Sequence, residues 1–182
     1  MPESQRLRIL VVGASGVLGR AIVAELSPRH DIVSAGSKSG DIRINIADPA
    51  SIVAGLKAAG PLDAVACAAG AVNWHPFSAI KLAGLEKSSY GLGLTNKLMG
   101  QVNLALAARD HINDHGSITL IAGVLSQTPI ATGSSASMVN AAIEAFAMAA
   151  AIEMPLGIRI NAVSPTVFGE SMADYGDRKS VV

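Results

Sequence analysis

Glycines close to the N-terminus have the type and spacing to bind a phosphate. Gly13, Gly16 and Gly19 recur at every third position. They follow the apolar run 9–12, which predicts a buried strand, and precede the run 20–26, which predicts a helix. Glycine lets the backbone turn tightly and approach a phosphate, and the helix N-terminus offers free N–H groups and a positive dipole. Any tight strand-to-helix turn uses glycine, but the order of elements on both sides favours a dinucleotide pyrophosphate site.

The other side chains that could bind a metal or attack a substrate are scattered. His111 and His115 are four residues apart, but the residues between them predict a turn, which would not hold both on one helix face. We therefore predict no metal site. Cys67 is the only cysteine of the chain. It excludes an intramolecular disulfide and is typical of a reducing compartment.

The composition is that of a large aliphatic core. Of the 182 residues, 50% are hydrophobic, 3% are aromatic and 15% are charged, which suits a parallel sheet covered by helices. Lys plus Arg and Asp plus Glu each number 14, for a formal charge of zero. This balance indicates neither a nucleic-acid nor a membrane-surface partner.

The chain shows no linker or repeat that would divide it. We predict one nucleotide-binding domain over residues 1–182, with a polar tail from about residue 169 that is poorly packed or truncated. The N-terminus does not resemble a signal peptide, and no apolar run approaches the length that spans a bilayer. We therefore expect a cytoplasmic protein.

Predicted strands alternate with predicted helices along the whole chain. Right-handed crossovers between such units give a doubly wound parallel sheet, a Rossmann-like α/β fold in three layers with strand order 3-2-1-4-5-6. A ligand then binds at the carboxyl ends of strands one and four, where the order reverses. The strands are expected at 9–12, 30–35, 41–46, 62–68, 116–122 and 158–163, and the helices at 20–26, 49–58, 85–112 and 134–154.

Motifs in several places resemble the short-chain dehydrogenase/reductase family. The glycine turn 13–19 matches the cofactor loop of its extended and atypical branches, and Cys67-Ala-Ala-Gly70 stands where the family has Asn-Asn-Ala-Gly. The block 149–165 is similar to the end of the catalytic helix and the sixth strand. The likeness runs from about Leu7 to Phe168, and it implies an NAD(P)-dependent oxidoreductase.

The resemblance also implies which residues hold the cofactor. The glycine turn would bind the pyrophosphate, Asn45 and Ile46 would face the adenine, and the backbone after strand six would meet the nicotinamide. The residues implied are Gly13, Ser15, Gly16, Val17, Leu18, Gly19, Asn45, Ile46, Ala68, Ala69, Gly70, Pro165, Thr166 and Val167.

The turn after strand two favours NADP over NAD. An acid at this point would bind the ribose 2′-hydroxyl of NAD, but the chain has Gly36, Ser37, Lys38 and Ser39. A hydroxyl and a cation suit a 2′-phosphate. The alternative is a polar β-turn with a solvated lysine.

The standard catalytic residues of the family are replaced. The family uses Asn, Ser, Tyr and Lys, and the corresponding positions here are Lys97, Ala122–Gly123, Ala136 and Asn140. Lys97 is the remaining catalytic candidate, because an ammonium can stabilise an oxyanion or donate a proton. The alternative is a lysine whose stem lies along the surface. Tyr90, seven residues earlier, is expected on the same helix face and is a weaker candidate.

Two functions remain open from the sequence. One is an NADP-dependent oxidoreductase that acts on a small carbonyl or alcohol through a non-standard site. The other is a catalytically silent NADP-binding protein, either a redox sensor or a partner subunit. The helix 134–154 is apolar almost all round, and family members pair such helices between subunits. We therefore expect a homodimer or tetramer through the helices 85–112 and 134–154.

Overall fold

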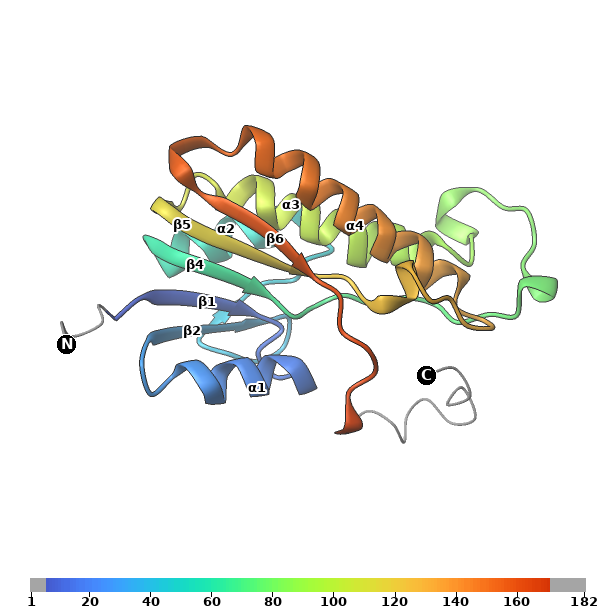
Figure 1. Cartoon of the computed structure of the whole chain (residues 1–182), viewed down its shortest axis with the longest axis horizontal. Coiled ribbons are helices and arrows are strands. Elements are labelled where there is room, and N and C mark those ends of the chain that lie inside the picture. Colours follow the sequence, from blue (N-terminus) through green and yellow to red (C-terminus); the bar gives the residue numbers. More distant parts are fainter. Residues whose placement is uncertain (1–5, 171–182) are drawn as a thin grey trace.

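The computed structural model describes residues 6–170, and its centre is a parallel sheet of six strands (Figure 1). The strand order is β3-β2-β1-β4-β5-β6, which confirms the predicted doubly wound order. Each neighbouring pair is parallel, so all carboxyl ends of the strands meet at one edge. The bounds are β1 (Arg8–Val12), β2 (Asp31–Gly36), β3 (Ile42–Arg43), β4 (Leu62–Cys67), β5 (Ile112–Ile121) and β6 (Arg159–Val163).

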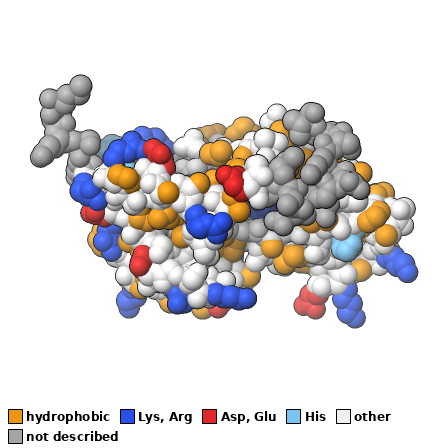
Figure 2. All heavy atoms as spheres, turned by 90° about the horizontal axis from the view of Figure 1, so that it is seen from below, with side chains coloured by type: hydrophobic (Ala, Val, Ile, Leu, Met, Phe, Trp, Pro, Cys, Tyr) orange, Lys and Arg blue, Asp and Glu red, His pale blue; other side chains and the backbone are white. Residues whose placement is uncertain are grey.

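Helices cover the two faces of the sheet unequally. In Figure 1, α2, α3 and α4 lie above the sheet, while α1 lies below it beside β1 and β2. Figure 2 views the molecule from the α1 side, where hydrophobic and polar side chains are interspersed. The bounds are α1 (Val17–Leu26), α2 (Pro49–Ala59), α3 (Met99–Ala108) and α4 (Ser134–Glu153), with short helical segments η1 (Phe77–Ala79), η2 (Leu85–Lys87), η3 (Gly93–Leu98), η4 (Val124–Ser126) and η5 (Pro155–Gly157).

The core follows this uneven coverage. The larger cluster of buried side chains lies between the sheet and α2, α3 and α4, and a small one lies under α1. Leu10, Leu104, Ile118 and Ile143 in the larger cluster are fully buried. Aliphatic residues supply almost all of this burial, as the composition predicts, and their removal from water is the main source of stability.

The predicted helix over 85–112 is wrong in its extent. The structure divides this region into η2, the π-helical η3 and α3, and β5 begins at Ile112. Glycine explains part of the division. A Cβ on Gly93 would lie 2.9 Å from Ser135 Oγ of α4, and one on Gly100 would lie 2.8 Å from the Ile46 carbonyl oxygen. These glycines let the segment pass close to two neighbours.

The other boundaries shift by a few residues. β3 is limited to Ile42–Arg43, shorter than the predicted 41–46, and α1 begins at Val17. Asp48 caps α2, because its side chain accepts a hydrogen bond from the Ala50 N–H at 2.9 Å. Within the predicted tail, residues 171–182 lie outside the described part of the chain.

The helix α4 combines a buried and an exposed apolar face. Val139, Ile143 and Ala147 are buried, whereas Met148 is 68% and Ile152 is 86% exposed. By length and a mean hydropathy of 1.4, α4 also meets the criteria for a membrane span. This corrects the expectation that no apolar run is long enough. Its buried face contacts β5, β6 and η3, and 33% of the apolar window is buried.

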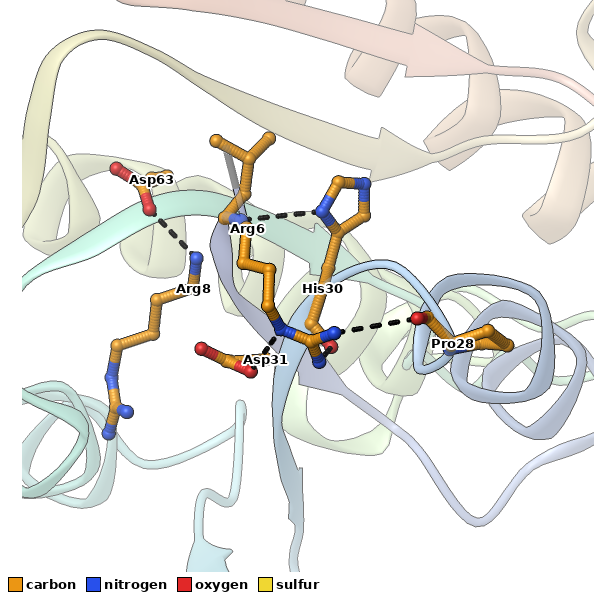
Figure 3. A network of polar contacts seen from close by, with 7 residues as sticks. Arg6, Arg8, Pro28, His30, Asp31 and Asp63 are labelled. Carbon is orange, nitrogen blue, oxygen red and sulfur yellow. Dashed lines mark hydrogen bonds and ion pairs between the residues drawn. The ribbon is translucent and has the colours of Figure 1, made fainter. Parts of the chain in front are cut away.

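Polar contacts tie the strands together at their amino ends, opposite the glycine turn (Figure 3). Arg6 Nε bonds Asp31 at 3.0 Å, and the Arg8 N–H donates to Asp63 at 2.7 Å. The latter bond lowers the pKa of Asp63. The Leu7 N–H donates to His30 Nδ1 at 3.3 Å. These contacts connect β1, β2 and β4 at the edge opposite the glycine turn.

Candidate functional site

The glycine turn lies where β1 and β4 meet at the carboxyl edge. Gly13 has φ +85°, and a Cβ there would lie 2.8 Å from the Ala68 carbonyl carbon. A Cβ on Gly19 would lie 2.0 Å from the Gly13 carbonyl oxygen. Both positions therefore require glycine, because the turn packs against β4 and against the start of α1.

The start of α1 is open to an anion. Gly16 is its N-cap and supplies no side-chain hydrogen bond. The N–H groups of Val17, Leu18 and Gly19 belong to the first helical turn, where no intrahelical carbonyl can pair them. Ser15 is exposed beside them. The site therefore has the donors and the close backbone approach that a pyrophosphate requires.

The predicted cofactor residues after β4 and β6 lie at the same edge of the sheet. Ala68 is anchored by its N–H to the Val12 carbonyl at 2.7 Å, and Ala69 and Gly70 follow it. After β6, the Pro165 carbonyl accepts from the Val124 N–H at 3.0 Å. Thr166 is exposed and Val167 is partly buried. The structure thus brings these segments to the edge that carries the glycine turn.

The two residues predicted to face the adenine differ from each other. Asn45 is exposed, and its side-chain oxygen accepts from the Ala47 N–H at 3.1 Å. Ile46 is 5% exposed and belongs to the core above the sheet. Its side chain serves packing, and its backbone is the part that remains able to meet a ligand.

Two cations lie at the turn after β2, and its acid is engaged. Ser37 and Lys38 are exposed. Arg43 Nη1 donates to the Gly40 carbonyl at 2.7 Å, which holds its guanidinium at the turn. Asp41 accepts from the Ser34 N–H at 2.8 Å and the Ser34 hydroxyl at 2.7 Å, and these bonds lower its pKa. Arg43 was missed from the sequence because it stands in β3, and only its hydrogen bond to Gly40 brings the guanidinium to the turn.

The Lys97 ammonium points into the protein and donates two hydrogen bonds there. Its Nζ donates to the Ala122 carbonyl at 2.9 Å and to Asn140 Oδ1 at 2.7 Å. The side chain is partly buried. Burial lowers the pKa of Lys97 to about 8, because a low-dielectric surrounding disfavours the charged form. A solvated surface lysine is therefore excluded.

Backbone features of three elements make room for this lysine. Lys97 stands in the π-helical η3, a geometry that is rare and is frequent at functional sites. A Cβ on Gly70 would lie 2.6 Å from Lys97 Cγ, and one on Gly123 would lie 2.7 Å from Asn140 Nδ2. The Asn96 side chain accepts from the Ala71 N–H at 2.8 Å, which fixes η3 against the end of β4.

Tyr90 does not share the environment of Lys97. Its hydroxyl lies 3.3 Å from Ser134 Oγ, at the start of α4. The expected common helix face is wrong because Tyr90 precedes the π-helical segment and lies outside the continuous helix on which that expectation rested. Ala136, at the position of the family tyrosine, is buried and carries no hydroxyl.

One carboxylate, Glu144, with two serine hydroxyls bonded to it, was missed from the sequence. Glu144 Oε1 accepts from the Ser126 hydroxyl at 2.8 Å and also from the Ser164 hydroxyl. It therefore connects the segments that follow β5 and β6. Ser126 lies 18 and Ser164 lies 20 residues from Glu144, so no local pattern relates them. Glu144 also borders an open groove of about 530 Å³ between α4 and β6.

A second hidden polar group fixes α3 against the sheet. Gln101 is fully buried, and its amide pairs with both backbone groups of Ile121 at 2.9 and 2.8 Å.

Among residues 6–170, no group of three or more His, Cys, Asp or Glu side chains is arranged to hold a metal ion. Cys67 is buried, and burial raises the pKa of its thiol to about 11.

Comparison with known proteins now decides the family. A model of short-chain dehydrogenases described as "Enoyl-(Acyl carrier protein) reductase" matches residues 20–180. The chain belongs to the short-chain dehydrogenase/reductase family. This confirms the resemblance drawn from the motifs and supports an oxidoreductase at the level of the family. A search of curated proteins finds no match.

Solved structures agree with this assignment. The protein lin1944 from Listeria innocua is 38% identical over 96% of this chain and 84% of its own, with a TM-score of 0.90. A small-chain dehydrogenase in complex with NADPH is 25% identical over 88% of this chain and 70% of its own, with a TM-score of 0.76. A family member from Brucella melitensis, 18% identical over 94% of this chain and 80% of its own, shares the fold with a TM-score of 0.80.

Proposed function

We propose that the protein is an NADP-dependent reductase of a small carbonyl compound, or the corresponding alcohol dehydrogenase, with Lys97 as its proton donor. The observation that carries the proposal is the Lys97 ammonium. It is held by two hydrogen bonds at the carboxyl edge of the sheet, beside the segments suited to a dinucleotide. Membership in the family supplies the expectation of nicotinamide chemistry.

The residues present fit a nicotinamide dinucleotide. Gly13 and Gly19 leave the space that a Cβ would fill, and the first turn of α1 offers unpaired N–H groups. When it is bound, the reduced nicotinamide supplies the hydride that adds to a carbonyl carbon. The backbone after β6, at Pro165, Thr166 and Val167, would face that end of the cofactor.

Lys97 is suited to the proton transfer that completes the reduction. With a pKa of about 8, it is mostly protonated at neutral pH and still yields a proton more readily than a free lysine. One N–H bond of the ammonium breaks as its proton passes to the carbonyl oxygen of the substrate. Solvent then reprotonates the neutral amine that remains. The same ammonium would stabilise negative charge on that oxygen before the transfer.

The turn after β2 supports NADP as the preferred cofactor. Lys38 and Arg43 place two positive charges there, and Asp41 is engaged by Ser34. One carboxylate oxygen of Asp41 already accepts two hydrogen bonds from Ser34, whereas Lys38, Arg43 and the Ser37 hydroxyl offer charge and donors to a 2′-phosphate. The dehydrogenase solved with NADPH is consistent with this preference.

A silent NADP-binding protein is the second candidate. Ala136 stands at the position of the family tyrosine, and two of the three Lys97 N–H groups are engaged within the protein. A protein that senses the cofactor or serves as a partner subunit would bind NADPH in the same cradle and would reduce nothing. Turnover separates the two candidates.

The test is NADPH consumption with a panel of small aldehydes and ketones, alongside NADPH binding. Lys97→Met should lower kcat by about 10²–10⁴-fold, as expected for loss of a general acid, with the NADPH Kd unchanged. The exposed Lys57 on α2 provides the matched control, Lys57→Met. The reduction rate should fall above about pH 8, where Lys97 loses its proton. Equal turnover by Lys97→Met would remove the catalytic role, and tight NADPH binding without any turnover would favour the silent protein.

A further inference from the structure

Asn140 is an unusual residue at the centre of α4. This polar residue is only 3% exposed, and its neighbours on the buried face, Val139 and Ile143, are fully buried hydrophobic residues. A buried amide without partners costs on the order of 2–7 kcal/mol relative to water, depending on the reference state. Asn140 Oδ1 is satisfied by the Lys97 ammonium at 2.7 Å. The position therefore connects α4 directly to the proposed proton donor.

The two acceptors of Lys97 determine where its ammonium points. One is the backbone carbonyl of Ala122 after β5, and the other is the side chain of Asn140. An ammonium has three N–H groups in a tetrahedral arrangement. With two directions taken, the third is fixed, and among the described residues it has no hydrogen-bond acceptor. That N–H remains for a ligand atom.

We propose that Asn140 is the positioning residue of this site, orienting the Lys97 ammonium so that its third N–H faces the substrate oxygen. Lys97 and Asn140 then form a hydrogen-bonded pair in which the lysine and asparagine positions of the family are exchanged. The lysine stands where the family has its asparagine, and the asparagine stands where the family has its lysine. This inference rests on the proposed function for its consequence in catalysis, whereas the pairing itself is measurable without any substrate.

The charges around Lys97 define how its proton affinity responds to Asn140. From β4, Cys67 faces it as a neutral thiol, because burial raises the pKa of that thiol to about 11. From α4, Glu144 lies one turn beyond Asn140 and is bonded to Ser126 and Ser164. Among residues 6–170, no carboxylate forms an ion pair with Lys97. The neutral amide is thus its polar side-chain partner.

A pair of substitutions at Asn140 should move the pKa of Lys97 in opposite directions. Asn140→Asp introduces a carboxylate at the same distance, and an adjacent opposite charge should raise the pKa of Lys97 by about one unit or more. Asn140→Leu removes the acceptor, so the charged form loses a hydrogen bond and the pKa should fall. Shifts of opposite sign would establish the contact between position 140 and the Lys97 ammonium, and the reduction rates then test the positioning role.

The first measurement is an NMR titration of the lysine side chains in the protein without substrate, with the Lys97 signal assigned from Lys97→Met. The wild-type midpoint should lie near pH 8. Asn161→Asp, at an exposed asparagine of β6, is the matched control and should leave the midpoint in place. Equal midpoints in Asn140→Asp, Asn140→Leu and wild type would overturn the pairing. Circular dichroism checks that each variant is folded.

The second measurement is the pH profile of NADPH-dependent reduction. Its alkaline limb should move upward in Asn140→Asp, while Asn140→Leu should lose on the order of 10²-fold in kcat through misplacement of the ammonium, with NADPH binding unchanged. The double exchange Lys97→Asn with Asn140→Lys should recover at least about tenfold over the poorer of the two single variants, because it restores an ammonium–amide pair across η3 and α4. A shifted titration with unchanged rates and an unchanged pH profile would overturn the positioning role. A wild type without turnover would instead contradict the proposed function, and the titration would still decide the pairing.

Discussion

At the scale of residues, charge and hydroxyl groups at the end of β2 are arranged for a phosphate. Lys38 extends into solvent from the turn, Arg43 is held to the Gly40 carbonyl, and Ser37 is exposed beside them. Asp41, the acid of this turn, is bonded to Ser34 and stays ionised, so its one negative charge faces the two positive charges of Lys38 and Arg43. We expect these groups to decide between the two nicotinamide cofactors.

Substitution of Lys38 should therefore weaken the binding of NADPH and leave the binding of NADH unchanged. Lys38→Ala should weaken NADPH binding by about tenfold, since one charge-assisted hydrogen bond contributes roughly 1.5–3 kcal/mol at most and solvent screens part of it at an exposed site. NADH binding should not change. Isothermal titration of both cofactors measures the difference, with Lys57→Ala as the control. Equal losses for NADPH and NADH would contradict a 2′-phosphate site, as would NADH binding as tight as NADPH binding in the wild type.

At the scale of elements, close approaches at glycine explain why η3 and α3 take their path. Gly100, at the start of α3, lies against the backbone of the segment after β3, where a Cβ would meet the Ile46 carbonyl oxygen at 2.8 Å. This contact places η3, and with it Lys97, over the carboxyl edge of β4. Gln101 then fixes the same helix to the end of β5 through two hydrogen bonds.

Addition of one methyl group at Gly100 should force these elements apart. Gly100→Ala should lower the free energy of unfolding by about 1–3 kcal/mol, the usual cost of overpacking, although alanine favours the helix itself. Gly84→Ala is the matched control, because a Cβ there would meet no heavy atom within 4 Å. Urea unfolding of both variants measures the difference. A Gly100→Ala variant as stable as wild type would show that α3 can move without cost.

At the scale of the whole molecule, α3 and α4 each expose apolar side chains. Met99 and Leu106, which lie seven residues apart on α3, are 44% and 45% exposed. On α4, Met138 and Ile152 lie fourteen residues apart, with Met148 between them. Seven-residue spacing is the pattern of helices that pack against other helices. We propose that these faces meet in a homodimer or tetramer.

Carboxylates introduced by substitution on the apolar faces of α3 and α4 should separate the subunits. The wild type is expected to have the mass of a dimer or tetramer by light scattering at micromolar concentration. Leu106→Glu combined with Met138→Glu should shift it to a monomer, because burial of an unpaired carboxylate in an apolar interface costs several kcal/mol. Val53→Glu, at an exposed valine of α2, is the control and should leave the mass unchanged. A monomeric wild type would contradict the proposal.

The order of the sheet and the place of the ligand edge follow from the sequence alone. Strand and helix patterns alternate along the chain, and the handedness of crossovers leaves few topologies. Gly13 and Gly19, which flank Gly16, mark the turn at the switch point because a backbone that must bend and pack closely at these two positions admits no side chain. The block 149–165 identifies the family in the same way, since its residues are contiguous. These features depend on residues that are close together in the chain, so they can be predicted from the sequence.

The direction of the Lys97 side chain was decided only by the tertiary structure. Its two acceptors lie 25 and 43 residues away in the chain, and the π-helical η3 packs against α4. The same applies to Glu144, which meets Ser126 and Ser164 across two elements. The sequence by itself determined the fold and the edge where a dinucleotide would bind. How the Lys97 ammonium is held beside that edge depends on contacts between distant segments, and these form only when the helices pack on the sheet.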